Sequence, residues 1–594
     1  MSVPTAPPQS RRRGEILQEF VPGIVLFRSY QRGWLGKDIV AGLVLSALLV
    51  PQGMAYAELA GLPPVTGLYT SIMCLLGYAL FGPSRILVLG PDSSLGPMIA
   101  ATIAPLALSG GDPDKAIALA SVLAVLVGIV MTVAGFAHLG FVADLLSKPT
   151  QIGYMNGLAL TIVVGQLPKL FGFSVDADGL IGEAQAFLAG VADQVNPTAA
   201  VIGVGSLVGI LLLQRLVPRL PAVLVVVVLG ALAVNLLGLQ DDGVDTIGVL
   251  PQGFPPLTVP TVAWGDLPEL FLGAVAIAVV ALADTMSTAS SFAARRGERV
   301  HGDQEMIGIG AANIFAGFFQ GFPVSTSGSR TAVSEQAGSR SQVTGVVGAA
   351  VITVVLVFAT GVMQYVPQPT LGAIVIAAAL SLADLPATRR LWHQRRTEFT
   401  LSVAAFLGVA LLGVLPGILL AITLSILNVF RRVWWPHQAE LGRVDGLAGL
   451  HDTQNYPHSE LLPGLVVYRF DAPLIFANSR MFGDAVRAMA EEQPDLRWVI
   501  VAAEPVTDVD TTAADMLVEL DSWLNARGVS LAFAEVKDPV RAKIQRYELE
   551  RTIDPAHFYP TLDEAVAAYM AATGATWQDP TRPRKRHDRD DTPG

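Results

Sequence analysis

The chain contains little cysteine and little charge. Only one of its 594 residues, Cys74, is a cysteine. A single thiol excludes disulfide frameworks, iron–sulfur clusters and cysteine-based zinc sites, and its place in an apolar run predicts a packing role. Charged residues make up 15% of the chain, whereas a soluble domain carries roughly 25%. Together with a mean hydropathy of +0.51, this composition predicts a polytopic membrane protein.

Motifs of enzymes and of ATP-driven pumps are also missing. The sequence has eight histidines, and none stands at the spacing of metal ligands. It has no Gly-rich loop ending in Gly-Lys-Ser or Gly-Lys-Thr, which would hold nucleotide phosphates. The first forty residues are polar and basic and lack the pattern of a cleaved signal peptide. We therefore expect neither an enzyme nor an ATP-driven pump.

Long apolar runs fill the chain up to about residue 430, and ordinary soluble sequence follows. A helix needs about 20 apolar residues to cross a bilayer, and interrupted helices need fewer. The runs predict about fourteen spans, near 39–57, 65–82, 92–106, 117–137, 150–168, 197–216, 221–238, 269–292, 304–320, 327–337, 342–364, 369–385, 398–413 and 415–430. The third and the tenth of these begin with polar residues and are too short to span alone.

The charges in the connecting loops support this count. Cytoplasmic loops of membrane proteins carry an excess of Lys and Arg. Basic residues follow the even-numbered spans: Arg85, Lys148, Arg215, Arg219, Arg295, Arg296, Arg299, Arg340, Arg389, Arg390, Arg395, Arg396, Arg431 and Arg432. The two long loops on the other side carry acidic residues: Asp176, Asp178, Glu183, Asp193, Asp241, Asp242 and Asp245. We therefore expect a multi-pass protein of the cell membrane (plasma or inner membrane) with both termini in the cytoplasm.

The two short spans occupy the third position in each set of seven. Matching interruptions in two halves are a sequence signal for a transporter's binding site. In an inverted repeat the two broken helices meet near the middle of the membrane, each pointing its N-terminus at the other. Helix N-termini carry partial positive charge and unpaired N–H groups, so a facing pair predicts an anion site.

Four separate motifs resemble the SulP sulfate permease family, whose animal members include the prestin-like anion exchangers. They are PQGMAYAELAGLPPVTGLYTS (51–71), ALFGPSRILVLGPDSS (79–94), ALADTMSTASSFAAR (281–295) and GIGAANIFAGFFQGFPVSTSGSRTAVSEQAGSRSQ (308–342). The resemblance covers nearly the whole chain and ends in a STAS-like soluble domain. It implies a seven-plus-seven inverted repeat with two half-helices, a core domain that moves against a gate domain, a homodimer, and transport of small anions.

The resemblance also implies which residues bind the anion. By motif position these substrate-binding residues are Gln52, Tyr56, Ser93, Ser94, Ser327, Gly328, Ser329 and Arg330. Gln52 and Tyr56 lie one helical turn apart on one helix face, and we expect Asp92–Ser94 and Ser327–Ser329 to begin the two half-helices. Gln52 has a structural alternative as a contact between helices.

Three charged residues near this site have open roles. Asp284 stands where many members carry Glu, and with Thr288 it resembles the sodium ligands of sodium-coupled bicarbonate carriers; the alternative is a permanent counter-ion to Arg330. Arg330 adds positive field behind the anion, or forms a salt bridge with an acid such as Glu335. Asp92 departs from the family pattern, and it caps the half-helix, is protonated or binds a cation.

The resemblance and the changes in composition predict five parts of the chain. They are a cytoplasmic segment (1–36), a transmembrane anion-transport domain (37–432), a linker (433–462), a STAS domain (463–573) and a disordered charged tail (574–594). The STAS domain is predicted from short strands that alternate with helices. Its Asp510-Thr511 pair stands where related regulators carry an acceptor Ser or Thr, which makes Thr511 a regulatory candidate. The alternative is a helix cap by Asp510 or Thr512, the latter in a capping box with Asp515.

The function expected from these features is secondary active transport of a small inorganic anion. Sulfate is the first expectation, by symport with sodium or a proton through Asp284; no other cofactor and no nucleic acid is expected. The alternatives are sodium-coupled bicarbonate uptake, C4-dicarboxylate uptake, and an uncoupled exchanger or channel. A membrane-tethered STAS signalling module with a vestigial transport core is a further class, against which the polar residues of both half-helices argue.

Overall fold

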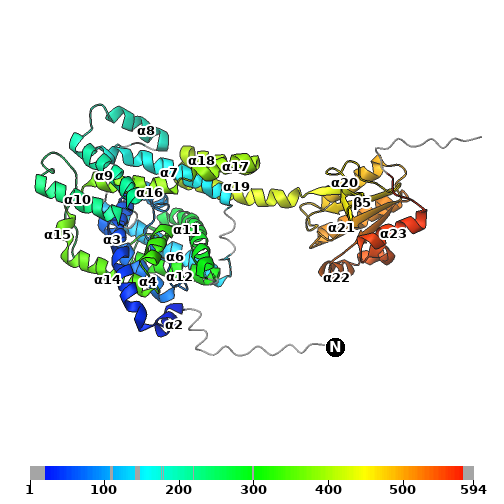
Figure 1. Ribbon diagram of the computed structural model, residues 1–594, viewed down its shortest axis with the longest axis horizontal. Coiled ribbons are helices and arrows are strands. Elements are labelled where there is room, and N and C mark those ends of the chain that lie inside the picture. The colour runs from blue at the N-terminus through cyan, green and yellow to red at the C-terminus, as the bar shows by residue number, and fades with distance from the viewer. Residues whose placement is uncertain are drawn as a thin grey trace, which may run out of the picture. The chain divides into compact units, whose positions relative to one another are not determined.

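The computed structural model describes residues 21–107, 112–140, 147–175, 177, 179–217, 220–296 and 300–578 (Figure 1). Arg219, Arg299, Asp176, Asp178 and the predicted tail from residue 579 onward lie outside these residues. The chain forms two compact units, Met1–Ile426 and Leu427–Gly594.

The first unit consists almost entirely of helices. They are α2 (Pro22–Arg28), α3 (Leu35–Leu59), α4 (Pro64–Phe81), α5 (Gly96–Ala107), α6 (Pro113–Phe136), α7 (Lys148–Leu170), α8 (Gly179–Gly190), α9 (Pro197–Leu216), α10 (Ala222–Leu237), α11 (Leu267–Arg296), α12 (Gly302–Phe318), α13 (Gly328–Gln336), α14 (Val343–Phe358), α15 (Thr360–Met363), α16 (Gln368–Leu382), α17 (Leu385–Gln394), α18 (Arg396–Leu412) and the part up to Ile426 of α19 (Val414–Trp434). Each interval predicted as a span holds a helix, while α2, α8 and α17 are helices that the sequence did not predict. Among the described residues, seven helical stretches are long and apolar enough to cross a membrane, and the full number of spans stays a prediction.

Proline sets where many of these helices begin. It stands in the first turn of α4, α6, α7, α9 and α16, where its missing N–H removes no hydrogen bond and its fixed φ suits a helix. Asn196 caps α9 by accepting from the N–H groups of Thr198 and Ala199 at 3.0 and 3.1 Å. Because proline and capping side chains act within one turn of the chain, the apolar runs and the proline positions predicted the helix intervals closely.

Packing divides these helices into two groups. In the first group α12 packs on α4 and α6, α14 on α3 and α4, and α11 on α5 and α6. In the second group α7 packs on α16 and α18, and α9 on α10 and α16. The two groups meet mainly where α3 contacts α10 and α16, so α3 lies at the boundary between them.

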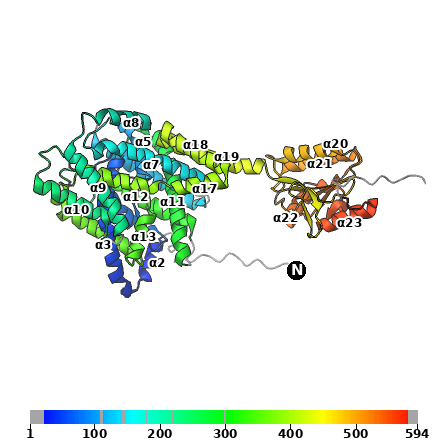
Figure 2. The same cartoon turned by 45° about the horizontal axis from the view of Figure 1, so that its top comes forward.

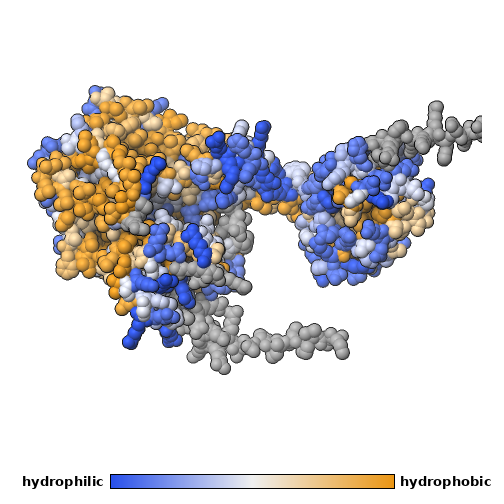
Figure 3. All heavy atoms as spheres, viewed as in Figure 1, coloured by the Kyte–Doolittle hydropathy of each residue, from blue (hydrophilic) through white to orange (hydrophobic). Residues whose placement is uncertain are grey.

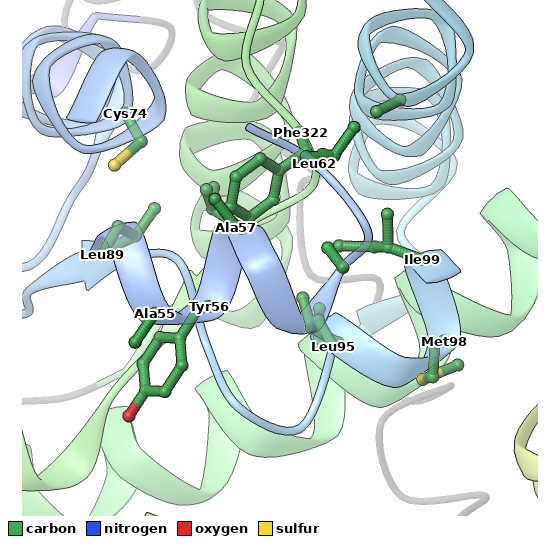
Figure 4. Close-up of a cluster of buried hydrophobic side chains, with 14 of the residues drawn as sticks. Ala55, Tyr56, Ala57, Leu62, Cys74, Leu89, Leu95, Met98, Ile99 and Phe322 are labelled. Atoms are coloured by element: carbon green, nitrogen blue, oxygen red, sulfur yellow. The ribbon is translucent and has the colours of Figure 1, made fainter. Parts of the chain in front are cut away.

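Glycine permits the closest helix contacts within the first group. A Cβ atom on Gly67 of α4 would lie 1.9 Å from the backbone oxygen of Gly53 on α3. Small residues at such crossings let backbones touch, which matters in a membrane because lipid supplies no hydrophobic force between helices. Cys74 is buried in the same apolar core (Figure 4), as its predicted packing role requires.

The surface of the first unit is strongly apolar. Figure 3 shows hydrophobic residues over most of the visible face of this unit, while the second unit is mainly hydrophilic. Large apolar side chains point outward on many helices, for example Leu236 and Phe358, which are 76% and 81% exposed. An apolar outer surface around a core that holds polar groups is the arrangement of a membrane-embedded protein.

The second unit is a six-stranded sheet with helices on both faces. Its elements are β3 (Gln438–Arg443), β4 (Leu450–Asp452), β5 (Leu465–Phe470), α20 (Ser479–Glu492), β6 (Trp498–Ala502), α21 (Thr511–Asn525), β7 (Ser530–Ala534), α22 (Asp538–Arg546), β8 (Phe558–Tyr559) and α23 (Leu562–Thr573). The strand order is β4-β3-β5-β6-β7-β8, with β5 to β8 parallel and β3 and β4 antiparallel. Figure 2 shows α20 and α21 on one side of the sheet and α23 on the other.

Alternation along the strands builds two cores in this unit. Val466 and Tyr468 of β5 face the core beneath α20 and α21, whereas Leu465 and Val467 face the core beneath α23. A strand buried on both faces requires such continuous apolar sequence. Residues 433–462, predicted as a linker, instead hold β3 and β4, and Gln578 in the predicted tail pairs with Leu461. These edge segments were missed because their sequence is polar and short.

Candidate functional site

A short strand pair joins the starts of the two half-helices. Strand β1 (Leu89–Gly90) precedes α5, strand β2 (Ser325–Thr326) precedes α13, and the two pair antiparallel. The pairing is extended by the Ser327 N–H, which donates to the Val88 carbonyl at 3.1 Å. The polar segments that the sequence singled out, over 200 residues apart, are therefore held at one place in the first helix group.

The first half-helix begins later than predicted. Helix α5 starts at Gly96, and residues 93–95 form a turn in front of it. Asp92 closes this turn: its Oδ1 accepts from the Ser94 N–H at 2.9 Å and from the Ser94 hydroxyl at 2.8 Å. The Asp92 carbonyl accepts from the N–H groups of Leu95 and Gly96. The Asp92 side chain thus caps the turn in front of α5 rather than the helix itself, and its protonation or cation binding stays a prediction.

The second half-helix begins as predicted. Ser327 is the N-cap of α13, and its hydroxyl accepts from the Arg330 N–H at 3.5 Å. The Ser327 and Ser329 hydroxyl oxygens lie 3.1 Å apart. Ser329 is exposed, while Ser327 and Gly328 are partly buried, so this helix start presents hydroxyl groups toward accessible space.

Arg330 is almost fully buried and pairs with Asp92. Its Nη2 lies 3.4 Å from Asp92 Oδ2, and its Nη1 donates to the Pro91 carbonyl at 2.5 Å. The alternative role of Arg330, a salt bridge with a nearby acid, is therefore observed, but the partner is Asp92 rather than Glu335, whose carboxylate lies 4.0 Å from Arg295. The Nε of Arg330 makes no hydrogen bond within the described part of the chain. The guanidinium thus links the two half-helix starts, which is why their charges must be considered together.

Asp284 lies next to this pair on α11. Its Oδ2 accepts from the Ser94 hydroxyl at 3.3 Å, and its Oδ1 accepts from the Gln151 side-chain amide at 3.2 Å. The alternative that made Asp284 the counter-ion of Arg330 is corrected, because that ion pair is formed by Asp92. Asp284 therefore shares Ser94 with Asp92 and stays partly exposed.

Thr288 lies one turn beyond Asp284 and faces the second half-helix. A Cβ built on Gly328 would be 3.7 Å from the Thr288 hydroxyl. Carboxylate and hydroxyl oxygens on one helix face are suitable ligands for a hard cation such as sodium. No cluster of three or more His, Cys, Asp or Glu side chains able to hold a metal ion occurs in the described ranges. Any cation here would depend on Asp284, Thr288 and backbone oxygens.

Helix α3 contributes Gln52 and Tyr56. Tyr56 is buried, its hydroxyl lies beside the Ser93 side chain, and Arg330 and Asp92 are within electrostatic range. Figure 4 shows its hydroxyl pointing away from the apolar side chains Ala57 and Phe322. Gln52 lies one turn earlier on α3 and is partly buried. The structure thus places Tyr56 at the half-helix starts, while the role of Gln52 stays a prediction.

Two residues of α7 reach the site without having been predicted. Gln151 bonds to Asp284, as described above, and Tyr154 is fully buried within electrostatic range of Asp284 and Asp92. The sequence signal was weak, because two polar side chains three positions apart at the start of an apolar helix are common. Gln151 and Tyr154 matter because α7 belongs to the second helix group.

The candidate regulatory residue lies at the start of α21. Asp510 is the N-cap of this helix, and its Oδ1 accepts from the Ala513 N–H at 2.8 Å. The predicted helix cap by Asp510 is therefore confirmed, whereas the capping box of Thr512 with Asp515 is wrong, since the helix begins at Thr511. Thr511 is exposed, and its regulatory role stays a prediction.

A helical membrane unit with two half-helices whose starts are joined by a strand pair, followed by a small α/β domain, defines a class of membrane transporter. The sequence pattern of the Sulfate permease family matches residues 35–405, and that of the STAS domain matches residues 456–565. The chain therefore belongs to the sulfate permease family, whose members are transporters rather than enzymes. The resemblance stated from the motifs is confirmed.

Known relatives cover nearly the whole chain. A probable sulfate transporter of Mycobacterium tuberculosis is 42% identical over 551 residues, which are 93% of this chain and 98% of that protein. The structure of the murine Solute Carrier 26 family member A9 anion transporter in the inward-facing state is similar with a TM-score of 0.88, 23% identity and 96% of each chain covered. The transmembrane domain of the cyanobacterial bicarbonate transporter BicA has a TM-score of 0.58 and 21% identity, covering 67% of this chain and 98% of that one. The predicted fold class, a helical membrane protein with a C-terminal STAS domain, is confirmed.

Proposed function

We propose that this protein transports sulfate across the cell membrane by symport with a sodium ion or a proton. The observation that carries the proposal is the pairing of two polar half-helix starts around a buried Arg330, with the carboxylate of Asp284 beside them. Membership in the sulfate permease family and the 42% identity to a probable sulfate transporter support sulfate as the anion. The TM-score of 0.88 against an anion transporter supports the view that the helices around the site are arranged as in that transporter.

The two half-helices would contribute unequally to anion binding. Asp92 accepts from the Ser94 N–H and hydroxyl, so its negative charge lies at the turn directly in front of α5. The start of α13 carries no acidic side chain in its first turn, so its partial positive charge remains available to an oxyanion. We expect Gly328, Ser329 and the Ser93 hydroxyl to supply the main donors, with Tyr56 as a wall of the site.

The charges around the site favour coupling to a cation. With Asp92 and Asp284 ionised and Arg330 protonated, the three groups together carry one negative charge. At an effective dielectric constant of about 20, a carboxylate about 5 Å from an anion costs roughly 3 kcal/mol. A cation bound at Asp284 would remove this repulsion, so anion and cation would bind together. Symport follows from that dependence, because neither ion binds well alone.

Sodium-coupled bicarbonate uptake is the second candidate. It is favoured by Thr288, which lies one helical turn after Asp284 on α11, near Gly328, and would be a second oxygen ligand for sodium. The fold similarity to the BicA transmembrane domain is compatible with it. Bicarbonate carries one negative charge and sulfate carries two. Which of the two anions the site prefers therefore depends on how much positive potential the site provides.

Uptake by purified protein in liposomes distinguishes these candidates. Labelled sulfate, bicarbonate and succinate would be offered separately, with a sodium gradient, a pH gradient or neither. Sulfate accumulation that requires one of the gradients is the expected result. Accumulation of bicarbonate or succinate instead would replace the substrate, and equal uptake without any gradient would indicate an exchanger or channel.

The proposal includes the cellular setting. The family places the protein in a membrane as a multi-pass chain. The predicted basic loops support the cell membrane with both termini in the cytoplasm, and we expect a homodimer. Cysteine accessibility at an introduced site in the second unit, together with the mass of the detergent-solubilised protein, tests these two points.

A further inference from the structure

Helix α7 is joined to the site-bearing helices near both of its ends. Near its start, the Gln151 amide donates to Asp284 Oδ1 at 3.2 Å. At its other end, Lys169 Nζ lies 3.6 Å from the carboxylate of Glu58 on α3. Since α7 packs mainly on α16 and α18, and α11 mainly on α5 and α6, these two side-chain contacts connect elements of different helix groups.

The contact at Gln151 involves the same carboxylate to which the coupling cation is assigned. Asp284 has two oxygens, and Ser94 and Gln151 each donate to one of them. Each carboxylate oxygen has two lone pairs, and a donor N–H takes up one of them together with part of the negative charge that a cation would bind. A hydrogen-bond donor and a cation therefore compete for the Asp284 carboxylate, and Gln151 is the donor that comes from the other helix group.

Tyr154 shows that this face of α7 belongs to the polar site. Its side chain is fully buried, yet its hydroxyl makes no hydrogen bond of ordinary geometry within the described residues. It lies against Gln151 and within electrostatic range of Asp284 and Asp92. A buried hydroxyl without a partner costs free energy, which is tolerated where a bound group or a second conformation supplies the partner.

We propose that Gln151 is a positioning residue of the transport site, which competes with the coupling cation for Asp284 and releases α7 when the cation binds. The inference rests on the proposed function, since it takes Asp284 as the coupling residue. It explains how cation binding on one helix group reaches the other, because the bond that is displaced is itself a link between the groups. Tyr154 moves with Gln151 on α7 and supplies a hydroxyl donor to the site.

The test measures cation binding apart from transport. The unfolding midpoint of the purified full-length protein would be followed against sodium concentration, with choline keeping ionic strength constant. Gln151→Met removes the competing donor, so the sodium concentration for half the effect should fall about 2- to 10-fold, the worth of one hydrogen bond. If the coupling ion is a proton, the half-effect pH should rise by about 0.3–1 unit, with Asp92, Tyr154 and Arg330 as the other titratable groups nearby.

A second variant covers the case in which Gln151→Met does not fold. Gln151→Asn keeps the amide but shortens the side chain by one methylene, and it should shift the half-effect in the same direction by a smaller factor. In liposomes both variants should also show a smaller ratio of uptake with the cation gradient to uptake without it. Unchanged or weaker cation binding in both variants would overturn the inference.

Lys169→Met is the matched control, because it breaks the other contact of α7 without touching Asp284. It should leave the sodium concentration, or the pH, for half the effect unchanged. An equal shift in Lys169→Met would mean that loosening α7 is sufficient, and competition at Asp284 would be rejected.

Asp284→Asn separates this inference from the proposed function. If Asp284→Asn removes the cation effect while the Gln151 variants behave as wild type, only the inference fails. If Asp284→Asn retains the cation effect and gradient-driven uptake, coupling through Asp284 fails, and the inference falls with it.

Discussion

The side chains of Asp92, Asp284 and Arg330 determine the electrostatics of the site. Asp92 both caps the turn before α5 and pairs with Arg330, so much of the positive charge of Arg330 is already compensated. Asp284 has Ser94 and Gln151 as donors rather than a cationic side chain. A carboxylate at membrane depth without a fixed cationic partner is costly and marks a functional group.

Asp284→Asn should abolish gradient-driven uptake while the protein still folds. The amide keeps the shape and part of the hydrogen bonding, but it lacks the negative charge that a coupling cation needs. Asp303→Asn is the control, since Asp303 is another carboxylate of the first unit and bonds to His138 outside the site. The measurement is labelled-anion accumulation in liposomes; accumulation by Asp284→Asn at the wild-type level would reject its coupling role.

Arg330→Gln should weaken binding of divalent sulfate more than binding of monovalent bicarbonate. Coulomb attraction scales with anion charge, and the substitution also leaves Asp92 without its partner, so we expect a loss of about tenfold or more for sulfate. The double variant Asp92→Asn/Arg330→Gln should recover part of this loss, because it removes the uncompensated carboxylate. Dissociation constants from calorimetry decide the point, and equal losses for both anions would make Arg330 only a structural partner of Asp92.

At the scale of helices and strands, the sequence predicted where elements lie better than how they meet. The intervals matched because apolar runs end at Pro, Gly and charged residues, which act locally. Strands β3 and β4 were missed, since the pairing of β3 with β5 and of β4 with β3 is a tertiary contact that their polar sequence does not indicate. The contacts of Gln151 and the Asp92–Arg330 pair were missed for the same reason, because a side chain's partner depends on which helices face each other.

Gly67→Ala should destabilise the contact between α3 and α4. Its new Cβ would lie 1.9 Å from the Gly53 oxygen, so the two backbones must separate. We expect a loss of about 1–3 kcal/mol in stability, as for an overpacked core, with lower sulfate binding because α3 carries Tyr56. Gly205→Ala is the control, since a Cβ there meets no atom within 4 Å. Thermal unfolding in detergent measures both, and equal midpoints for the two variants would contradict the close packing.

A pH effect is expected at the loop before α21 in the second unit. The Lys543 ammonium donates a hydrogen bond to Asp508 and lowers the pKa of that carboxyl below its ordinary value of 3.8. Folding therefore favours the ionised form, so the pair stabilises the fold above pH 3.8 and loses this effect as the pH falls through the lowered pKa. The pair is partly exposed, so its contribution is small and is screened by salt.

Asp508→Asn should accordingly lower the urea midpoint of a fragment of residues 427–594 at neutral pH. Near the lowered pKa and below it, the variant and the wild type should converge, because both then lack the charge. Lys543→Met should behave in the same way, since it removes the other partner. A loss of equal size at neutral and acid pH would show that the contact is not electrostatic.

At the scale of the whole molecule, all residues assigned to transport lie in the unit Met1–Ile426. The STAS domain in the second unit has its own two apolar cores and its own sheet. Neither unit needs the other to complete its hydrophobic core, and a domain with its own core folds separately. The site should therefore survive without the STAS domain.

Removal of all residues after 435 should leave a membrane protein that still binds sulfate. This cut keeps α19 complete, since that helix ends at Trp434, and it spares both half-helices and α11. Binding affinity should stay within about threefold of the full-length protein, a difference of less than 1 kcal/mol, while expression or turnover falls. The measurements are sulfate binding in detergent and uptake in liposomes at matched protein amounts. Truncated protein that is inserted and monodisperse but binds no sulfate would show that the STAS domain is required to form the site, and the assignment of the site to the half-helices alone would be wrong.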